Sequence, residues 1–105
     1  MPIVVVTAER LPDESAEITA AANVAQAVAE ALDLPPSEVY VTLTGANVAV
    51  VGDEPVRPWP VVVIYGREDG DRAAAVAAVK AVSARLWSMG PEKVWVQWVE
   101  PDPPR

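Results

Sequence analysis

Few residues of this chain could carry acid-base or metal chemistry near neutral pH. The sequence contains no histidine and no cysteine, so the commonest general base, the commonest metal ligand and thiolate chemistry are all missing. Its acidic residues show no catalytic pairing, and Asp13, Glu14 and Glu17 fit the first turn of a helix. No phosphate-binding glycine motif is present either. We therefore expect a protein that uses no metal and no other cofactor.

The group best suited to proton transfer is the nitrogen of Pro2. If Met1 is removed, Pro2 becomes a free secondary amine at the head of the apolar run Ile3-Val4-Val5-Val6. An exposed α-amino group has a pKa of about 8, and burial among apolar residues lowers that pKa. A neutral amine near pH 7 is a usable general base. If Met1 is retained, the nitrogen is an amide and cannot act as a base.

Four apolar runs and two amphipathic stretches must position this nitrogen. The runs predict strands over 3–7, buried on both faces, and over 39–44, 60–65 and 93–100, with a possible short strand at 48–51. A turn is expected at 45–47, a polar connector at 53–58 and a tail at 101–105. The stripe Ile18, Ala21, Ala25, Val28 and Leu32 predicts a helix that Pro35-Pro36 stops. A second helix is expected over 73–89, closed by Gly90.

The two halves of the chain repeat one pattern. Met1–Val6 matches Trp59–Ile64, and Pro36–Val41 matches Pro91–Val96. We therefore expect one α/β domain over 1–105, made of two pseudo-symmetric β-α-β units at 1–54 and 58–100. The two units predict a four-stranded mixed sheet with both helices on one face. The other face is then left bare, which favours association with further subunits.

Charge and hydropathy exclude some partners. Eight basic and 15 acidic residues give a net charge of −7, which argues against nucleic acid and anionic membranes. No apolar run reaches the roughly 20 residues of a membrane-spanning helix. Residues 1–6 lack the basic start of a signal peptide, so we expect a cytoplasmic protein.

An amino-terminal proline combined with a doubled β-α-β unit resembles the tautomerase superfamily. The similarity is greatest to the branch of macrophage migration inhibitory factor, which carries two units in each chain and forms trimers. It covers nearly the whole sequence, including Pro2, Pro35-Pro36, Tyr65-Gly66-Arg67 and the run from Val94 to Trp98. The resemblance implies a homotrimer that acts on small carboxylic acids with a keto, enol or haloalkene group.

The resemblance also implies site residues. Pro2 falls on the family's catalytic proline. Tyr65 stands where the branch has an isoleucine, and Leu34 stands where it has a pocket lysine. Trp95 and Gln97 replace a tyrosine and an asparagine of the last long strand, so the amide is kept and a phenol becomes an indole.

A carboxylate substrate needs a cationic partner, and arginine binds it bidentately. The candidates are Arg10, Arg57 and Arg67, and we prefer Arg67 because it ends the third strand. Arg10 lies near the position of one arginine of 4-oxalocrotonate tautomerase, and Tyr40 replaces the other. Each arginine taken singly also fits a solvated surface residue.

Three functions remain open from the sequence. The first is a tautomerase that interconverts keto and enol acids with Pro2 as the general base. The second is a dehalogenase or decarboxylase in which protonated Pro2 is the acid. The third is a trimeric binding protein without enzymatic activity, which the loss of the lysine and the tyrosine favours.

Overall fold

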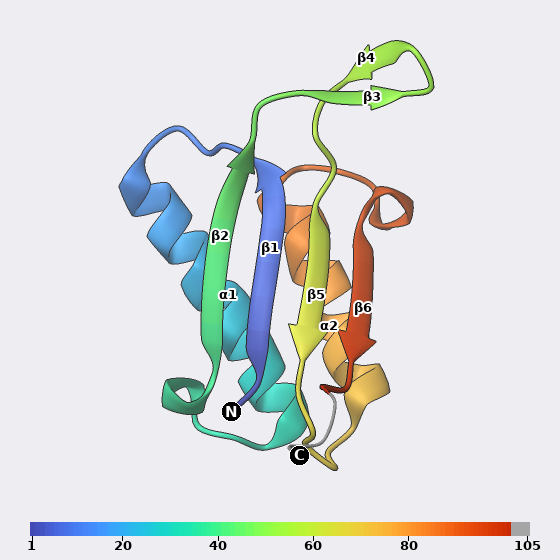
Figure 1. Cartoon of the computed structure of the whole chain (residues 1–105). Coiled ribbons are helices and arrows are strands. Elements are labelled where there is room, and N and C mark those ends of the chain that lie inside the picture. The colour runs from blue at the N-terminus through green and yellow to red at the C-terminus, as the bar shows by residue number, and fades with distance from the viewer. Residues whose placement is uncertain (102–105) are drawn as a thin grey trace.

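Two β-α-β units build the fold, as the sequence repeat predicts. The computed structural model describes residues 1–101. The first unit comprises β1 (Ile3–Glu9), α1 (Glu14–Leu32), η1 (Pro36–Glu38) and β2 (Tyr40–Ala46). The second comprises β5 (Val61–Tyr65), α2 (Arg72–Leu86), η2 (Pro91–Lys93) and β6 (Trp95–Val99). Between the units, β3 (Ala49–Val51) and β4 (Glu54–Val56) form a hairpin that projects beyond the sheet (Figure 1).

The four long strands form one mixed sheet in the order β2-β1-β5-β6. Within each unit the strands are parallel, whereas β1 and β5 pair antiparallel at the centre. The antiparallel centre points the two units in opposite directions. As a result, the start of β1 and the end of β5 meet at one end of the sheet (Figure 1).

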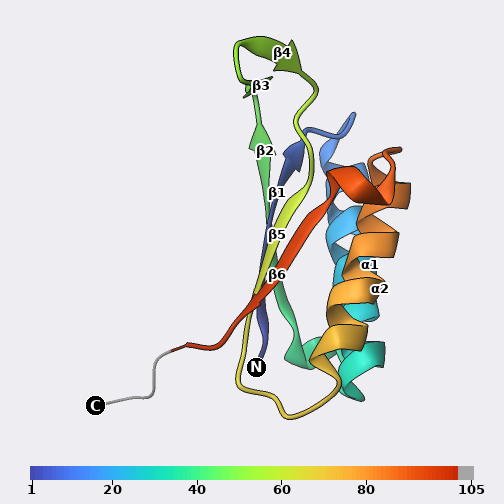
Figure 2. The ribbon, with the colours of Figure 1, turned by 90° about the vertical axis from the view of Figure 1, so that its right-hand side faces the viewer.

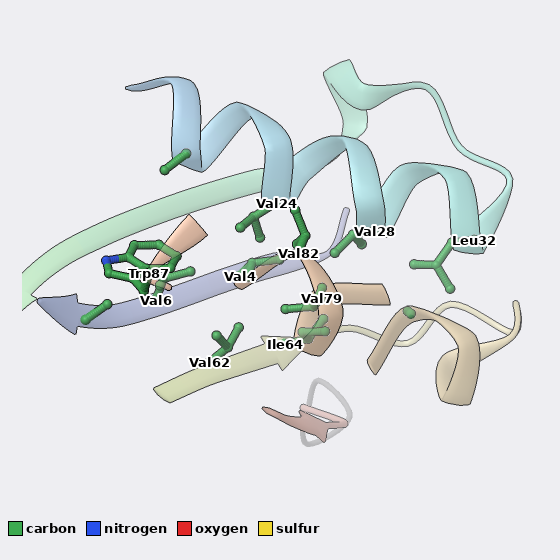
Figure 3. Packing of buried hydrophobic residues seen from close by; sticks show 13 residues of the cluster. Val4, Val6, Val24, Val28, Leu32, Val62, Ile64, Val79, Val82 and Trp87 are labelled. Carbon is green, nitrogen blue, oxygen red and sulfur yellow. The ribbon is translucent and has the colours of Figure 1, made fainter. Parts of the chain in front are cut away.

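Both helices cover the same face of this sheet, and the opposite face is bare in the single chain (Figure 2). Small aliphatic side chains fill the layer between sheet and helices (Figure 3). From the sheet these include Val4, Val6, Val62 and Ile64, and from the helices Val24, Val28 and Val79. Full burial of one such side chain stabilises the fold by roughly 1.5–3 kcal/mol. Alternate β1 residues such as Val4 are fully buried, whereas Ile3 is 43% exposed. The expectation that this strand is buried on both faces is therefore wrong for a single chain.

The helix starts follow the sequence closely. The Asp13 carboxylate accepts a hydrogen bond from the Ala16 amide at 2.8 Å, and Asp71 accepts one from Ala74 at 2.9 Å. These caps satisfy amide groups that have no partner within the first turn. The buried stripe of α1 differs from the predicted one, because Ile18 is 62% exposed. The stripe instead runs through Ala20, Val24, Val28 and Leu32. Ile18 precedes Ala20 by two residues, so its side chain points about 200° away from that of Ala20 around the helix axis.

The predicted ends of α2 and β2 are wrong. Helix α2 ends at Leu86, and Gly90 has a φ of −65° in front of η2. Ser88 adopts the left-handed backbone there instead, with φ of 53°. Strand β2 continues through Gly45 to Ala46 because β1 pairs with it as far as Glu9. The short strand at 49–51 is confirmed, and part of the expected connector pairs with it as β4.

Residues 102–105 of the predicted tail lie outside the described residues. No helix within residues 1–101 is long and apolar enough to cross a bilayer.

Candidate functional site

Pro2 lies between the start of β2 and the end of β5. It is fully buried, and its carbonyl oxygen accepts a hydrogen bond from the Tyr40 amide at 3.0 Å. Ile3, the next residue, is paired with Tyr40 on one side and Tyr65 on the other. Met1 precedes Pro2 in the described chain, so the Pro2 nitrogen is an amide here. The sheet thus fixes the position of the nitrogen, and removal of Met1 would expose it as an amine.

A carboxylate that the sequence analysis did not single out lies at the same end. Glu68 Oε1 is 3.1 Å from the amino-terminal nitrogen of Met1, and the Glu68 side chain is only 20% exposed. Glu68 Oε2 is buried and has no hydrogen-bond partner among the described residues. The antiparallel pairing of β1 with β5 would have revealed Glu68, since it brings the residues after Tyr65 to the start of β1.

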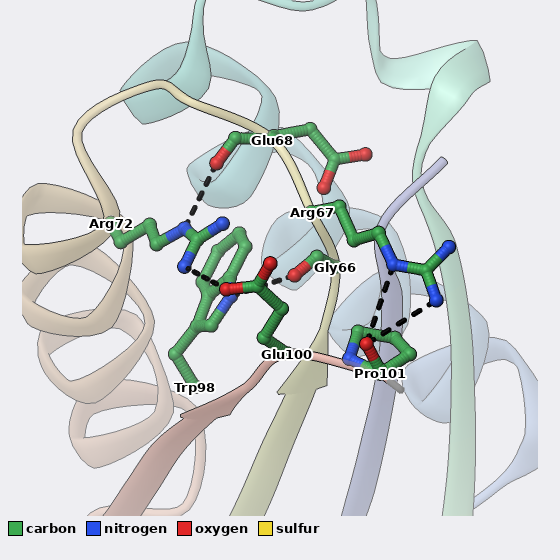
Figure 4. A network of polar contacts seen from close by, with 7 residues as sticks. All are labelled: Gly66, Arg67, Glu68, Arg72, Trp98, Glu100 and Pro101. Atoms are coloured by element: carbon green, nitrogen blue, oxygen red, sulfur yellow. Dashed lines mark hydrogen bonds and ion pairs between the residues drawn. The ribbon is translucent and has the colours of Figure 1, made fainter. Parts of the chain in front are cut away.

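Two tyrosines and an arginine share this end of the sheet. Tyr40 and Tyr65 lie directly opposite Ile3, so their side chains stand on the bare face beside it. They are 54% and 37% exposed. Arg67 follows β5, and its Nε and Nη2 atoms both donate to the Pro101 carbonyl at 3.3 Å (Figure 4). Pro2, Tyr40, Tyr65 and Arg67 are therefore brought to one end by the fold.

Within one chain, the remaining predicted site residues lie farther from Pro2. Val99 pairs with Tyr65, and Trp95 precedes Val99 by four residues, or about 13 Å along the strand. Gln97 lies between them on the bare face, opposite Val63. Arg10 follows the far end of β1, about 23 Å from Ile3, and its side chain packs against Gly45. A single chain cannot bring Trp95 or Arg10 to the Pro2 nitrogen.

Arg57, the third candidate arginine, also belongs to the far end. Its Nη2 and Nε atoms donate to the two Glu9 carboxylate oxygens at 3.0 and 3.2 Å. The hydrogen bond from Arg57 lowers the pKa of Glu9, and the same contact raises the pKa of Arg57. Surface hollows of about 390 and 290 Å³ lie at this end, and Pro2 lines neither of them. Among residues 1–101 no cluster of three or more acidic side chains is placed to hold a metal ion.

Comparisons with known proteins identify the fold. No family model and no curated protein matches the sequence. Solved structures do match: native fused 4-OT is 21% identical, with 94% of this chain and 86% of that chain covered and a TM-score of 0.80. Macrophage migration inhibitory factor from Giardia lamblia is 18% identical, with 94% and 98% covered and a TM-score of 0.79. A similar protein from Entamoeba histolytica is 13% identical, with 95% and 88% covered and a TM-score of 0.78.

These three structures match the present chain over 94–95% of its length. The chain therefore has the fold of the tautomerase superfamily, as the resemblance in the sequence implies. At these identities the likeness defines the fold, and the activity has to be argued from the residues at the site.

Proposed function

We propose that this chain is a tautomerase-type enzyme that interconverts the keto and enol forms of a small carboxylic acid. Once Met1 is removed, the Pro2 amine acts as the general base. The observation that supports this most is the position of Pro2 on a tautomerase fold, buried between two strands and at the same end as Arg67. The sequence has no histidine or cysteine to compete for the role.

The proposed reaction needs one proton acceptor and one anion partner. In the ketonisation direction, the amine takes the proton of the enol hydroxyl as the carbonyl forms. A proton is then delivered from the ammonium to the carbon, so the amine returns to its neutral form. General acid-base catalysis of this kind contributes about 10²- to 10⁴-fold. Arg67 holds the substrate carboxylate, and Tyr65 and Tyr40 line its path from the bare face.

We further propose that the active form is a homotrimer. The bare face of the sheet supports this, as do two structural neighbours, in which fused 4-OT is an asymmetric trimer and a symmetric trimer. Trp95, Gln97 and Arg10 lie too far from Pro2 in one chain, so a neighbouring copy is needed to supply them. We also propose a cytoplasmic location, and the net charge of −7 favours a small-molecule substrate over nucleic acid or a membrane.

A second candidate, a dehalogenase- or decarboxylase-like reaction, is favoured by Glu68. Such a reaction uses protonated Pro2 as an acid. The Glu68 carboxylate, 3.1 Å from the terminal amine, stabilises a positive charge at this position. Both candidates require the free Pro2 nitrogen.

The experiment compares processed protein with a form that cannot be processed. Intact mass identifies chains without Met1, and a lysine inserted between Met1 and Pro2 gives the blocked form. We expect the processed chain to ketonise phenylenolpyruvate, at a rate that falls as the pH drops through the pKa of the amine. Equal rates for both forms would exclude Pro2 as the base. Rates no higher than buffer for either form would favour a non-enzymatic binding protein.

A covalent probe gives a second measurement. One neighbour, 17% identical with a TM-score of 0.80, was solved after inactivation by 2-oxo-3-pentynoate. If the Pro2 amine of this chain is free and reactive, the same compound should add once to each processed chain and not to the blocked form. Intact mass followed by peptide mapping would locate the adduct.

A further inference from the structure

The contact between Glu68 and the amino-terminal nitrogen bears directly on how Pro2 would work. Glu68 Oε1 is 3.1 Å from the Met1 nitrogen. Three bonds separate that nitrogen from the Pro2 nitrogen, and they span at most about 4 Å. The carboxylate therefore lies within about 7 Å of the Pro2 nitrogen before any side chain moves.

The strand register brings Pro2 close to Gly66, which precedes Glu68 by two residues. The last pair of the β1–β5 ladder is Ile3 with Tyr65, so Pro2 and Gly66 follow next on adjacent strands. Glu68 Oε2 lies directly over Gly66, where a Cβ atom would meet it. Adjacent strands are about 4.8 Å apart, so a carboxylate above Gly66 lies beside Pro2.

Several contacts hold Glu68 in this place (Figure 4). Arg72 Nε donates to the Glu68 carbonyl at 2.9 Å, and the Arg72 guanidinium lies 5.1 Å from the centre of the Trp98 ring. Trp98 Nε1 in turn donates to the Gly66 carbonyl at 3.0 Å. Oε2 is buried without a partner among residues 1–101, and a buried oxygen in that state costs about 1–3 kcal/mol. An ammonium group beside it would remove that cost.

We propose that Glu68 is the counter-ion of the amino terminus and that, after Met1 is removed, it holds the Pro2 amine in its protonated form near neutral pH. The proposal rests on the proposed function for the processing of Met1 and for the role of the amine. It reverses the expectation from the sequence, in which apolar burial alone acts on the amine and favours its neutral form. An opposite charge within about 4–6 Å favours the charged form instead.

The protonation state that Glu68 imposes on the Pro2 amine decides whether the site acts as an acid or as a base. With Glu68 present, the protonated amine is the main species at pH 7, and it can donate a proton to a substrate carbon. The neutral form, which is the general base, becomes abundant only at higher pH. Glu68 thus acts through Pro2 as a positioning residue, and it decides whether acid or base chemistry dominates at a given pH.

Other ionisable side chains also lie around this end of the sheet, and apart from Glu100 they are the same in every variant that tests the proposal. They come from each element that meets here: Asp33 after α1, Glu38 in η1, Tyr40 at the start of β2, Tyr65 and Arg67 at the end of β5, Arg72 in α2 and Glu100 after β6. Arg72 and Glu100 are ion-paired at 3.2 Å. Glu100→Gln is therefore a matched control, because it removes a carboxylate from the same end that already has its own partner.

The test measures the titration of the amine directly. Processed protein labelled with ¹⁵N-proline would be titrated by NMR, following the Pro2 nitrogen in the wild type, Glu68→Gln and Glu100→Gln. We expect the titration midpoint to fall by about one pH unit in Glu68→Gln and to stay near the wild-type value in Glu100→Gln. Thermal melts would confirm that all three proteins are folded.

The outcomes separate this inference from the proposed function. Equal midpoints in the wild type and Glu68→Gln would overturn the role of Glu68, whatever the activity. A lowered midpoint in Glu68→Gln without any ketonisation would support the counter-ion and reject the tautomerase. If ketonisation occurs, its rise with pH should begin about one unit lower in Glu68→Gln than in the wild type.

Discussion

At the scale of single residues, the site depends on which strand ends meet. Pro2 precedes β1 and Arg67 follows β5, and the antiparallel pairing of these strands places both at one end of the sheet. Arg57 is bound to Glu9 and Arg10 packs on Gly45, both at the other end. Of the three candidate arginines, Arg67 is thus the one that lies at the Pro2 end of the sheet within its own chain.

Replacement of Arg67 tests this assignment. Arg67→Ala should raise KM for a 2-keto or enol acid by about 10- to 150-fold, since a charge-assisted hydrogen bond contributes about 1.5–3 kcal/mol. We expect kcat to change less than KM, because the carboxylate is bound in ground and transition state alike. Steady-state kinetics gives both constants. Arg85→Ala, on the exposed surface of α2, is the control, and an unchanged KM in Arg67→Ala would return Arg67 to the ordinary surface.

Sequence reasoning reached Pro2, Tyr65 and Arg67 because strand ends can be read from apolar runs and their flanking residues. It missed Glu68, because a glutamate after a strand looks like a solvated charge until the neighbouring strand is known. Which strand lies beside β5 is set by the order β2-β1-β5-β6 of the sheet, and this order cannot be inferred from either β-α-β unit alone. The functional roles of all these residues remain predictions, and those of Trp95 and Arg10 also depend on a second chain.

At the scale of elements, one buried indole connects β1 with the end of α2. Trp87 follows α2 and is 2% exposed, and its Nε1 atom donates to the Glu9 carbonyl at 2.8 Å. Arg57 joins the same cluster, since its Nη2 donates to the Trp87 carbonyl at 3.2 Å and to the Glu9 carboxylate. These contacts keep the second unit packed against the first at the end opposite Pro2.

Trp87→Phe should destabilise the protein through loss of this bond. The Glu9 carbonyl would lose its indole partner and part of the ring packing would go, so we expect a decrease of about 1–3 kcal/mol in the free energy of unfolding. Chemical denaturation measures it. Trp59→Phe is the matched control, because Trp59 is partly exposed and contacts Lys93 through its ring face, 5.8 Å from the ring centre. An equal effect of both substitutions would contradict the role given to the Trp87 hydrogen bond.

The elements themselves were largely predictable, and the errors have physical causes. Hydrophobic periodicity located both helices, but it could not say which stripe of α1 meets the sheet, because alanines occupy most faces of that helix. The Gly90 prediction failed because Ser88 tolerates the left-handed backbone and the chain then enters η2. Strand β2 was predicted too short, because its extent follows from pairing with β1 rather than from its own residues.

At the scale of the whole molecule, the bare face of the sheet is the main unexplained surface. Its side chains form rows across the four strands, with Tyr40, Ile3, Tyr65 and Val99 at the Pro2 end. The next row is Thr42, Val5, Val63 and Gln97, and a third is Thr44, Thr7, Val61 and Trp95. A face of this extent with so few charges is typical of an interface between subunits. Its rows extend from Ile3, the residue after Pro2, to Trp95, so we expect assembly to affect the proposed site.

A charge in the middle of this face should separate the subunits without unfolding the chain. Val63 points away from the helices, so Val63→Lys leaves the core intact but buries an ammonium in the proposed interface, where an unpaired charge is costly. Light scattering should give about three times 11.2 kDa for the wild type and close to 11.2 kDa for Val63→Lys. Ala77→Lys, on the exposed side of α2, should leave the mass of the assembly unchanged.

If Trp95 and Gln97 reach Pro2 from a neighbouring copy, Val63→Lys should also lose ketonisation while its circular dichroism stays native. A monomeric wild type would refute the trimer, and a monomeric but fully active Val63→Lys would show that one chain holds the complete site.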